Sequence, residues 1–250
     1  MMTPNYILKT TNLQKNFSGI IAAEDINISV KEGEIIGIIG ANGAGKTVFV
    51  NMITGYLKPS SGKIEFSGKD ITGIQPRDAT HIGVCRSFQV SQVFMTMTVK
   101  QNLMVAMSLA KKSGSQLLLP LDDENLSKEC DKILDLYKIK KQSNLIVSTL
   151  SQGMRKLLDI AMAVVGNPKV LLLDEPTSGV SVEEKFGIMD IVISALKKTG
   201  TTVLFVEHDM EIVERYVDRV IAFYQGQIIC DDTPKKALKN KKVIQYVLGS

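Results

Sequence analysis

Short apolar runs alternate along the chain with longer segments in which apolar residues recur at helical spacing. Three runs have the length of a strand and almost no polar position, at residues 34–40, 170–174 and 202–206. Continuous runs of this kind are typical of strands that are covered on both faces of a sheet. We therefore predict that all three are buried strands.

Helical patterns follow two of these runs. One begins at Lys46 and stops at Gly55. The other spans residues 183–198 and ends before Gly200, which suits the left-handed position after a helix. Residues 220–224 and 227–230 predict a terminal hairpin. Strands and helices that alternate in this way indicate an α/β fold with a parallel sheet.

Two stretches depart from this alternation. Residues 6–33 and 62–85 contain short strands and turn signals, which predicts a small antiparallel layer attached to the core. The turn signals are at residues 18–19, 32–33, 61–62 and 67–68. Residues 98–111 and 122–138 have helical patterns on either side of a loop with Gly, Ser and Pro at 113–121.

These boundaries predict one domain over residues 1–250. Its α/β core would comprise about residues 1–89 and 151–250. A helical insertion would occupy about residues 90–150.

The composition is that of an ordinary globular chain. Of 250 residues, 44% are hydrophobic and 22% are charged, which excludes a disordered chain and a collagen-like repeat. No apolar run approaches the roughly 18 residues that a membrane-spanning helix needs, and residues 1–11 lack the pattern of a secretory signal. Cys85, Cys130 and Cys230 are far apart, which favours small buried side chains in a reducing compartment over disulfides.

The charge balance says less about function. Thirty Lys and Arg against 26 Asp and Glu give a formal net charge of +4, which is too mild to indicate a nucleic-acid-binding protein. The basic residues cluster only near the end, at Lys235, Lys236, Lys239, Lys241 and Lys242. We interpret this cluster as a solvated helix face, with a patch for a membrane surface as the alternative.

A glycine-rich motif of the form G-x-x-x-x-G-K-[ST] lies between the first buried strand and the first helix. Its residues are Gly40, Ala41, Asn42, Gly43, Ala44, Gly45, Lys46 and Thr47. Glycines let the backbone wrap so that N–H groups point at phosphate oxygens, and the helix adds the positive end of its dipole. Lys46 supplies a mobile charge and Thr47 a hydroxyl ligand for Mg²⁺. The alternative is an ordinary glycine-rich turn.

Two carboxylates follow the second buried strand. Asp174 and Glu175 lie at its carboxyl end, the edge at which open α/β sheets bind ligands. Asp174 is a candidate Mg²⁺ ligand, and Glu175 is a candidate base for an attacking water. The alternative is a plain helix start, which Pro176 and Thr177 also suggest.

Further candidates carry less weight alone. Ser151 precedes an amphipathic helix as a natural N-cap, and Ser151 with Gly153 is also a possible second anion site. Gln89 is a candidate ligand of Mg²⁺ or water, but a lone Gln is more often a surface residue. His208 follows the third buried strand and is either structural or a phosphate contact. Phe17 is either a core residue or a platform for a nucleobase.

In this order, the motifs resemble those of the nucleotide-binding subunit of ABC (ATP-binding cassette) transporters over nearly the whole chain. Residues 40–47 resemble the Walker A loop, 150–154 (LSQGM) the signature motif and 171–175 the Walker B motif. The other matches are Phe17 with the adenine-stacking aromatic, Gln89 with the Q-loop, residues 178–181 with the D-loop and His208 with the switch histidine. The resemblance implies a P-loop NTPase (RecA-like) core with a parallel sheet, an N-terminal antiparallel β layer and a helical subdomain.

The resemblance also implies a mechanism. ATP would bind to residues 40–48 of one subunit and to Ser151, Gln152 and Gly153 of a second ABC ATPase subunit, identical or paralogous. Mg²⁺ would be held by Thr47, Gln89 and Asp174, and hydrolysis would use Glu175 and His208. The pair would drive transmembrane permease subunits from the cytoplasmic face of the inner (plasma) membrane.

A narrower likeness is to the ATPase subunits of branched-chain amino acid importers. It rests on residues 83–89, 94–107, 207–210 and 243–249. The ATPases of lipopolysaccharide export and urea import have similar motifs and remain alternatives.

Four positions in three motifs depart from the family pattern. Val48 stands where a second Ser or Thr is usual, so one hydroxyl contact to phosphate is missing. The signature has Gln152 and Met154 in place of Gly and Gln, and Ser181 replaces the usual D-loop Asp.

Two other classes of protein remain as rival interpretations. ABC-type ATPases of DNA repair or translation have long coiled-coil insertions or two cassettes, whereas this chain has one Walker loop and no heptads between Lys46 and Ser151. A module that only binds ATP would not need Glu175 and His208. Val48 and Ser181 keep this binding module as an alternative, and release of phosphate from Mg-ATP would separate it from an ATP-hydrolysing subunit.

Overall fold

The computed structural model describes residues 6–87, 93–111 and 124–249. Its strands are β1 Tyr6–Phe17, β2 Ile20–Lys31, β3 Ile35–Ile39, β4 Ser61–Phe66, β5 Lys69–Asp70, β6 Val84–Arg86, β7 Val170–Asp174, β8 Thr202–Val206, β9 Arg219–Tyr224 and β10 Gln227–Asp232. Its α-helices are α1 Lys46–Ile53, α2 Pro76–Ile82, α3 Val99–Lys111, α4 Glu124–Leu136, α5 Gln152–Ala163, α6 Val182–Thr199, α7 Met210–Tyr216, α8 Pro234–Ala237 and α9 Lys241–Val243. Short 3-10 turns occur at Lys140–Gln142 and Val147–Thr149, and a π-helical turn at Ile244–Leu248.

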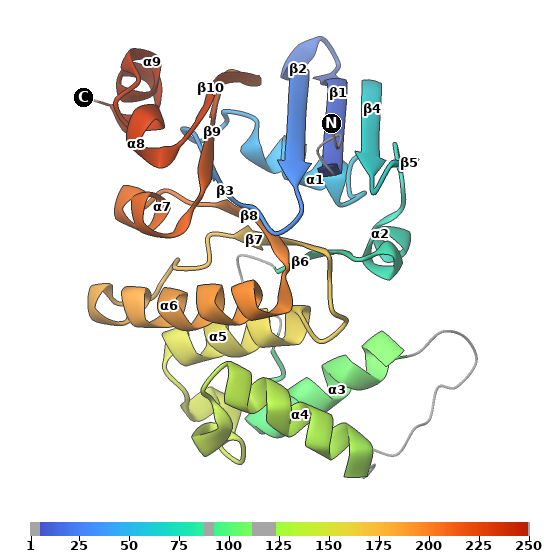
Figure 1. Ribbon diagram of the computed structural model, residues 1–250, viewed down its shortest axis with the longest axis vertical. Helices are drawn as coiled ribbons and strands as arrows, with labels where there is room; N and C mark the ends of the chain where they lie inside the picture. Colours follow the sequence, from blue (N-terminus) through green and yellow to red (C-terminus); the bar gives the residue numbers. More distant parts are fainter. Residues whose placement is uncertain (1–5, 88–92, 112–123, 250) are drawn as a thin grey trace, which may run out of the picture.

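Six strands form the central sheet, in the order β10-β9-β3-β8-β7-β6 (Figure 1). Neighbouring strands are parallel except for the hairpin of β9 and β10 at one edge. The three apolar runs of the sequence are β3, β7 and β8, and nearly all of their residues are buried. The predicted parallel sheet and the predicted terminal hairpin are therefore confirmed.

Each strand of this sheet contributes alternate residues to two hydrophobic clusters. Leu171 and Leu173 of β7 pack on one face with apolar residues of α3 to α7. Val170 and Leu172 pack on the other face with α1 and the antiparallel sheet. Because successive side chains of a strand point to opposite faces, a strand covered on both faces is apolar at every position, which explains the unbroken runs.

The predicted antiparallel layer is a four-stranded sheet in the order β2-β1-β4-β5. One of its expected turns is wrong, because Ser61 and Gly62 lie inside β4. Gly62 has a φ of 88°, and a Cβ there would lie 2.3 Å from the carbonyl oxygen of Asn12 in β1. The glycine therefore marks a close approach of two strands. The stretch 62–85 also contains α2 and most of β6, which joins the parallel sheet instead.

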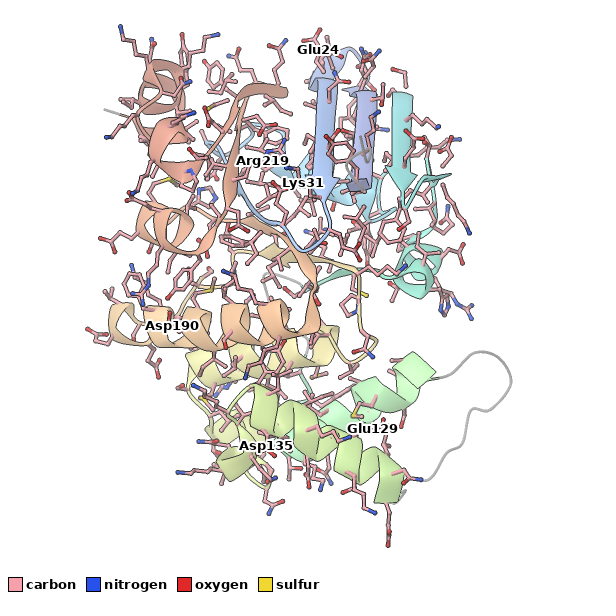
Figure 2. All side chains as sticks on the ribbon, viewed as in Figure 1. Glu24, Lys31, Glu129, Asp135, Asp190 and Arg219 are labelled. Atoms are coloured by element: carbon pink, nitrogen blue, oxygen red, sulfur yellow. The ribbon has the colours of Figure 1, made fainter. Side chains whose placement is uncertain are left out.

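Arg219, labelled in Figure 2, connects the two sheets. Its guanidinium donates to the backbone oxygen of Ser29 in β2 at 2.8 Å and to the carboxylate of Asp231 in β10 at 2.5 Å. Glu34 lies 3.5 Å from the same group. Since the planar guanidinium carries five donors, one side chain holds β2 against the edge formed by β9 and β10.

The two helical patterns predicted at 98–111 and 122–138 are α3 and α4. They lie at the end of the molecule opposite the antiparallel sheet (Figure 1). Leu126, Cys130 and Leu134 of α4 belong to the same hydrophobic cluster as α5, α6 and one face of the central sheet. The loop predicted at 113–121 lies outside the described residues. Within the described residues, no helix has the length and apolar character that crossing a membrane requires.

Two further predictions concern the clustered lysines and the three cysteines. The lysines around α8 and α9 are exposed, which fits both a solvated face and the alternative of a patch for a membrane surface: Lys235, Lys236, Lys239, Lys241 and Lys242. All three cysteines are free thiols, and Cys130 is fully buried while Cys85 and Cys230 are partly buried.

Candidate functional site

Most of the predicted site residues meet in one pocket at the carboxyl edge of the central sheet. The pocket has a volume of about 460 Å³. It is lined by Ala22, Asn42, Gly43, Ala44, Gly45, Lys46, Thr47, Val48, Arg86, Asp174, Glu175, Val206 and His208. The parallel strands β3, β7 and β8 all end at this edge, so the topology gathers residues that are far apart in the sequence.

The glycine-rich loop joins β3 to α1 and needs glycine at two positions for steric reasons. A Cβ on Gly40 would lie 2.5 Å from the carbonyl oxygen of Phe223, and a Cβ on Gly45 would lie 2.8 Å from that of Ala22. Gly45, with a φ of 104°, immediately precedes α1. The first N–H groups of a helix have no partner within it, so this close-packed loop presents donors to an anion in the pocket.

Lys46 is buried within the loop. Its ammonium donates to the carbonyl oxygens of Gly40 at 2.5 Å and Ala41 at 3.0 Å. Burial lowers the pKa of Lys46, while the nearby carboxylates of Glu175 and Asp174 raise it. The ammonium of Lys46 therefore lies at the pocket wall, where two neutral carbonyl groups accept its hydrogen bonds. A phosphate would be a stronger acceptor because it is charged.

The carboxylates lie where β7 ends. Asp174 is the last residue of β7, and Glu175 follows with a φ of 47°. The Glu175 backbone N–H donates to the carbonyl oxygen of Val206 in the neighbouring strand at 3.0 Å. Its side-chain Oε1 lies 3.3 Å from Nε2 of His208, which is partly exposed to the pocket. The turn at Glu175 thus brings an acid and an imidazole together from two adjacent strands.

Sequence reasoning missed two contributors to this edge. The guanidinium of Arg86 donates to Asp174 at 2.5 Å and to Asn51 of α1 at 2.6 Å. The buried carboxylate of Glu207 accepts hydrogen bonds from the Thr177 N–H and hydroxyl at 3.1 and 2.7 Å, and from the His208 N–H at 3.1 Å. The available signal was position, since Arg86 ends β6 and Glu207 directly follows β8.

The signature segment lies apart from the pocket-lining residues. Ser151 caps α5 as predicted, since its Oγ accepts from the Met154 N–H at 3.3 Å. Gly153 is buried at the start of α5. Gln152 packs against Gly179, where an added Cβ would come within 2.3 Å of the amide nitrogen. The start of α5 therefore contacts residues 178–181, and residues 151–153 do not line the pocket.

Three other predicted residues, Gly40, Ala41 and Phe17, do not line the pocket. Phe17 ends β1 and is 42% exposed, with the Lys15 ammonium 4.9 Å from its ring centroid. Gln89 lies outside the described residues. Ser181, the departure in the D-loop, is the N-cap of α6 and accepts from the Glu184 N–H at 3.3 Å.

Comparisons with known proteins agree with this architecture. A family model described as ABC transporter matches residues 23–178. The probable branched-chain amino acid transport ATP-binding protein LivG of Methanocaldococcus jannaschii is 35% identical over 97% of both chains. The high-affinity branched-chain amino acid transport ATP-binding protein LivG of Escherichia coli K12 is 32% identical over 97% of this chain and 98% of its own.

Solved structures give the same result. A crystal structure of the ADP conformation of an ATP-binding cassette from an ABC transporter has a TM-score of 0.87 and 33% identity, over 98% of this chain and 99% of that chain. A nucleotide-free ATP-binding cassette from an ABC transporter has a TM-score of 0.84 and 34% identity, over 96% of this chain and 98% of that chain. The chain therefore belongs to the ABC transporter family and is an ABC ATPase subunit.

Proposed function

We propose that this chain binds ATP with Mg²⁺ and hydrolyses it to power a membrane importer of branched-chain amino acids or similar compounds. The observation that carries the proposal is the shared pocket of the glycine-rich loop, Lys46, Asp174, Glu175 and His208. The transported class rests on the named relatives, which are branched-chain amino acid transport proteins over nearly the same length. A similar solved structure is an ADP form, which supports nucleotide as the ligand.

The loop and the start of α1 would bind the phosphates. Backbone N–H groups of residues 43–48 would donate to phosphate oxygens, and Lys46 would exchange its two carbonyl acceptors for the β- and γ-phosphates. Phe17 would stack on the adenine ring. Its place at the end of β1, with an exposed ring, supports that role.

The donor set in the pocket fits Mg²⁺. Thr47 offers a hydroxyl and Asp174 a carboxylate, both facing the same cavity, and Gln89 is proposed as a further ligand. In residues 6–87, 93–111 and 124–249, no group of three or more His, Cys, Asp or Glu side chains forms a cage for a metal ion. That suits Mg²⁺, which keeps water and substrate phosphates as most of its ligands. When bound, the ion neutralises charge on the transferred phosphoryl group.

Glu175 and His208 would carry the hydrolytic step. Glu175 would orient the attacking water and accept its proton, while His208 would contact the γ-phosphate. The 3.3 Å separation of their side chains supports a shared role, because each can hold the other in place beside the same substrate.

A second ABC ATPase subunit, identical or paralogous, would complete the site. Ser151, Gln152 and Gly153 do not line the pocket of their own chain, so they would serve the nucleotide of the partner. Permease subunits would receive the motion through a helical subdomain of about residues 90–150, with the remainder of residues 1–250 as the core. The ATPase would accordingly sit on the cytoplasmic face of the membrane.

The test is phosphate release from Mg-ATP by the purified chain and two variants. Glu175→Gln should bind ATP but lose turnover, and it should accumulate as an ATP-bound dimer on size exclusion. The matched control, Glu183→Gln, changes an exposed carboxylate in the first turn of α6 and should hydrolyse ATP normally. Full activity in Glu175→Gln would refute the assignment of the base. The membrane protein that co-purifies with the chain would test the transported class.

A further inference from the structure

The guanidinium of Arg86 holds the carboxylate that the proposed function assigns to Mg²⁺. One nitrogen donates to Oδ2 of Asp174 at 2.5 Å, and another donates to Oδ1 of Asn51 at 2.6 Å. Both charged side chains are largely buried, with 11% of Arg86 and 16% of Asp174 exposed. A short ion pair with so little solvent is weakly screened and is held by the planar geometry of the fork.

The fold makes this contact a fixed part of the pocket. β6 and β7 are parallel neighbours, with Arg86 opposite Leu172, so the two strands end at the same edge. Asn51 reaches the same point from α1, the helix that follows the glycine-rich loop. Arg86 thus joins three elements that all border the nucleotide pocket, and it lines that pocket itself.

Two cations would therefore require the same carboxylate. Arg86 holds Oδ2 of Asp174, and a guanidinium and a hydrated Mg²⁺ that shared this one carboxylate would repel each other. We propose that Arg86 is a positioning residue that occupies Asp174 in the absence of metal, so that Mg²⁺ with nucleotide binds by displacing the guanidinium. The inference rests on the proposed function, since it assumes that Asp174 serves Mg²⁺.

A direct phosphate contact by Arg86 makes a different prediction. If Arg86 simply bound ATP, its removal would weaken nucleotide binding equally with and without Mg²⁺. If Arg86 competes with the ion, its removal strengthens the dependence of binding on Mg²⁺. The ratio of the two nucleotide affinities therefore separates the two roles, and a merely structural role leaves that ratio unchanged.

The experiment measures the dissociation constant of a fluorescent N-methylanthraniloyl ATP for the full chain, in saturating Mg²⁺ and in EDTA. For Arg86→Gln, the ratio of affinity with Mg²⁺ to affinity without it should rise about tenfold over wild type. Arg86→Lys keeps the charge, but an ammonium cannot bridge two acceptors as a guanidinium does. Its ratio should therefore lie between those of wild type and Arg86→Gln.

A matched control is Arg215→Gln. Arg215 also pairs with a carboxylate, that of Asp190 at 3.2 Å, on the surface between α6 and α7 (Figure 2 labels Asp190). This variant removes the same charge and should keep the wild-type ratio. Asn51→Ala removes one anchor of Arg86 and leaves its charge, so its ratio should rise about threefold.

The outcomes are separable. An unchanged or lower ratio in Arg86→Gln, or an equal rise in Arg215→Gln, overturns the inference while the proposed function stands. If Arg86→Gln does not fold, Asn51→Ala decides, because a raised ratio supports the competition and an unchanged ratio refutes it. Failure of the wild-type chain to bind the nucleotide under either condition would instead refute the proposed function.

Discussion

Replacing Thr177 by valine removes one hydroxyl group that serves a buried charge. The hydroxyl donates to Oε1 of Glu207 at 2.7 Å, and both side chains are largely buried. Valine has the same shape, so the main change is the lost donor. A hydrogen bond to a charged group contributes about 1.5–3 kcal/mol, whereas one between neutral groups contributes about 0.5–1.5 kcal/mol.

The stability that Thr177→Val loses should depend on pH. Burial raises the pKa of Glu207 above its ordinary 4.5, and the hydrogen bonds from Thr177 oppose that rise. A raised pKa in the folded state means that stability is greatest at low pH and falls as the pH increases from 4.5 through the folded pKa. Thr177→Val raises the pKa further, so the variant loses more stability than wild type over the same pH increase.

The assay is urea unfolding of both proteins at pH 8 and pH 4.5, with the free energy from linear extrapolation. We expect the free energy of unfolding of Thr177→Val to be lower than that of wild type by about 2 kcal/mol at pH 8 and by about 1 kcal/mol at pH 4.5. The matched control is Thr54→Val, whose buried hydroxyl donates at 2.7 Å to the neutral carbonyl of Val50. Its loss should be about 1 kcal/mol at both pH values. Equal losses for Thr177→Val at the two pH values would refute the role of the Glu207 charge.

Three other substitutions test separate parts of the structure. Phe17→Ala should weaken ATP binding by about 1–3 kcal/mol through lost base stacking, while Phe17→Tyr should bind normally; equal affinities in a fluorescence titration would remove Phe17 from the site. Val48→Ser should tighten ATP binding about tenfold, because it adds a hydroxyl at the pocket wall within reach of a phosphate; weaker binding in calorimetry would contradict this. Gly62→Ala should lower the melting temperature more than Gly68→Ala, since both glycines have positive φ but only Gly62 faces a backbone atom, at 2.3 Å.

Local sequence patterns predicted much of the fold, since the strands of the sheet centre carry their own signal. β7 and β8 match the predicted runs residue for residue, because burial on both faces leaves only apolar positions in the interior of each strand. β6 has only three residues and was assigned in part to the antiparallel layer, since so short a run shows no period. Gly62 predicted a turn, whereas a close strand pairing explains it.

Some residues of the candidate site could likewise be predicted from local sequence, and others could not. Residues 40–47 were predicted as a unit, because the whole glycine-rich motif consists of consecutive residues. Arg86 and Glu207 were missed because each acts on a partner 88 or 30 positions away, and only the parallel strand order brings them together. The roles proposed for Ser151 and Gly153 would depend on a second chain, which no pattern within one chain displays.

The burial of β7 on both faces determines which part of the protein a cavity-forming mutation affects. The central sheet separates two hydrophobic clusters that are packed independently. Leu171 faces the compartment of α5 and α6, and Leu172, the very next residue, faces that of α1 and the antiparallel sheet. A cavity at Leu171 would loosen the packing of α5, and a cavity at Leu172 would loosen the packing beneath the glycine-rich loop and α1. Neighbours in the chain would thus produce unrelated defects.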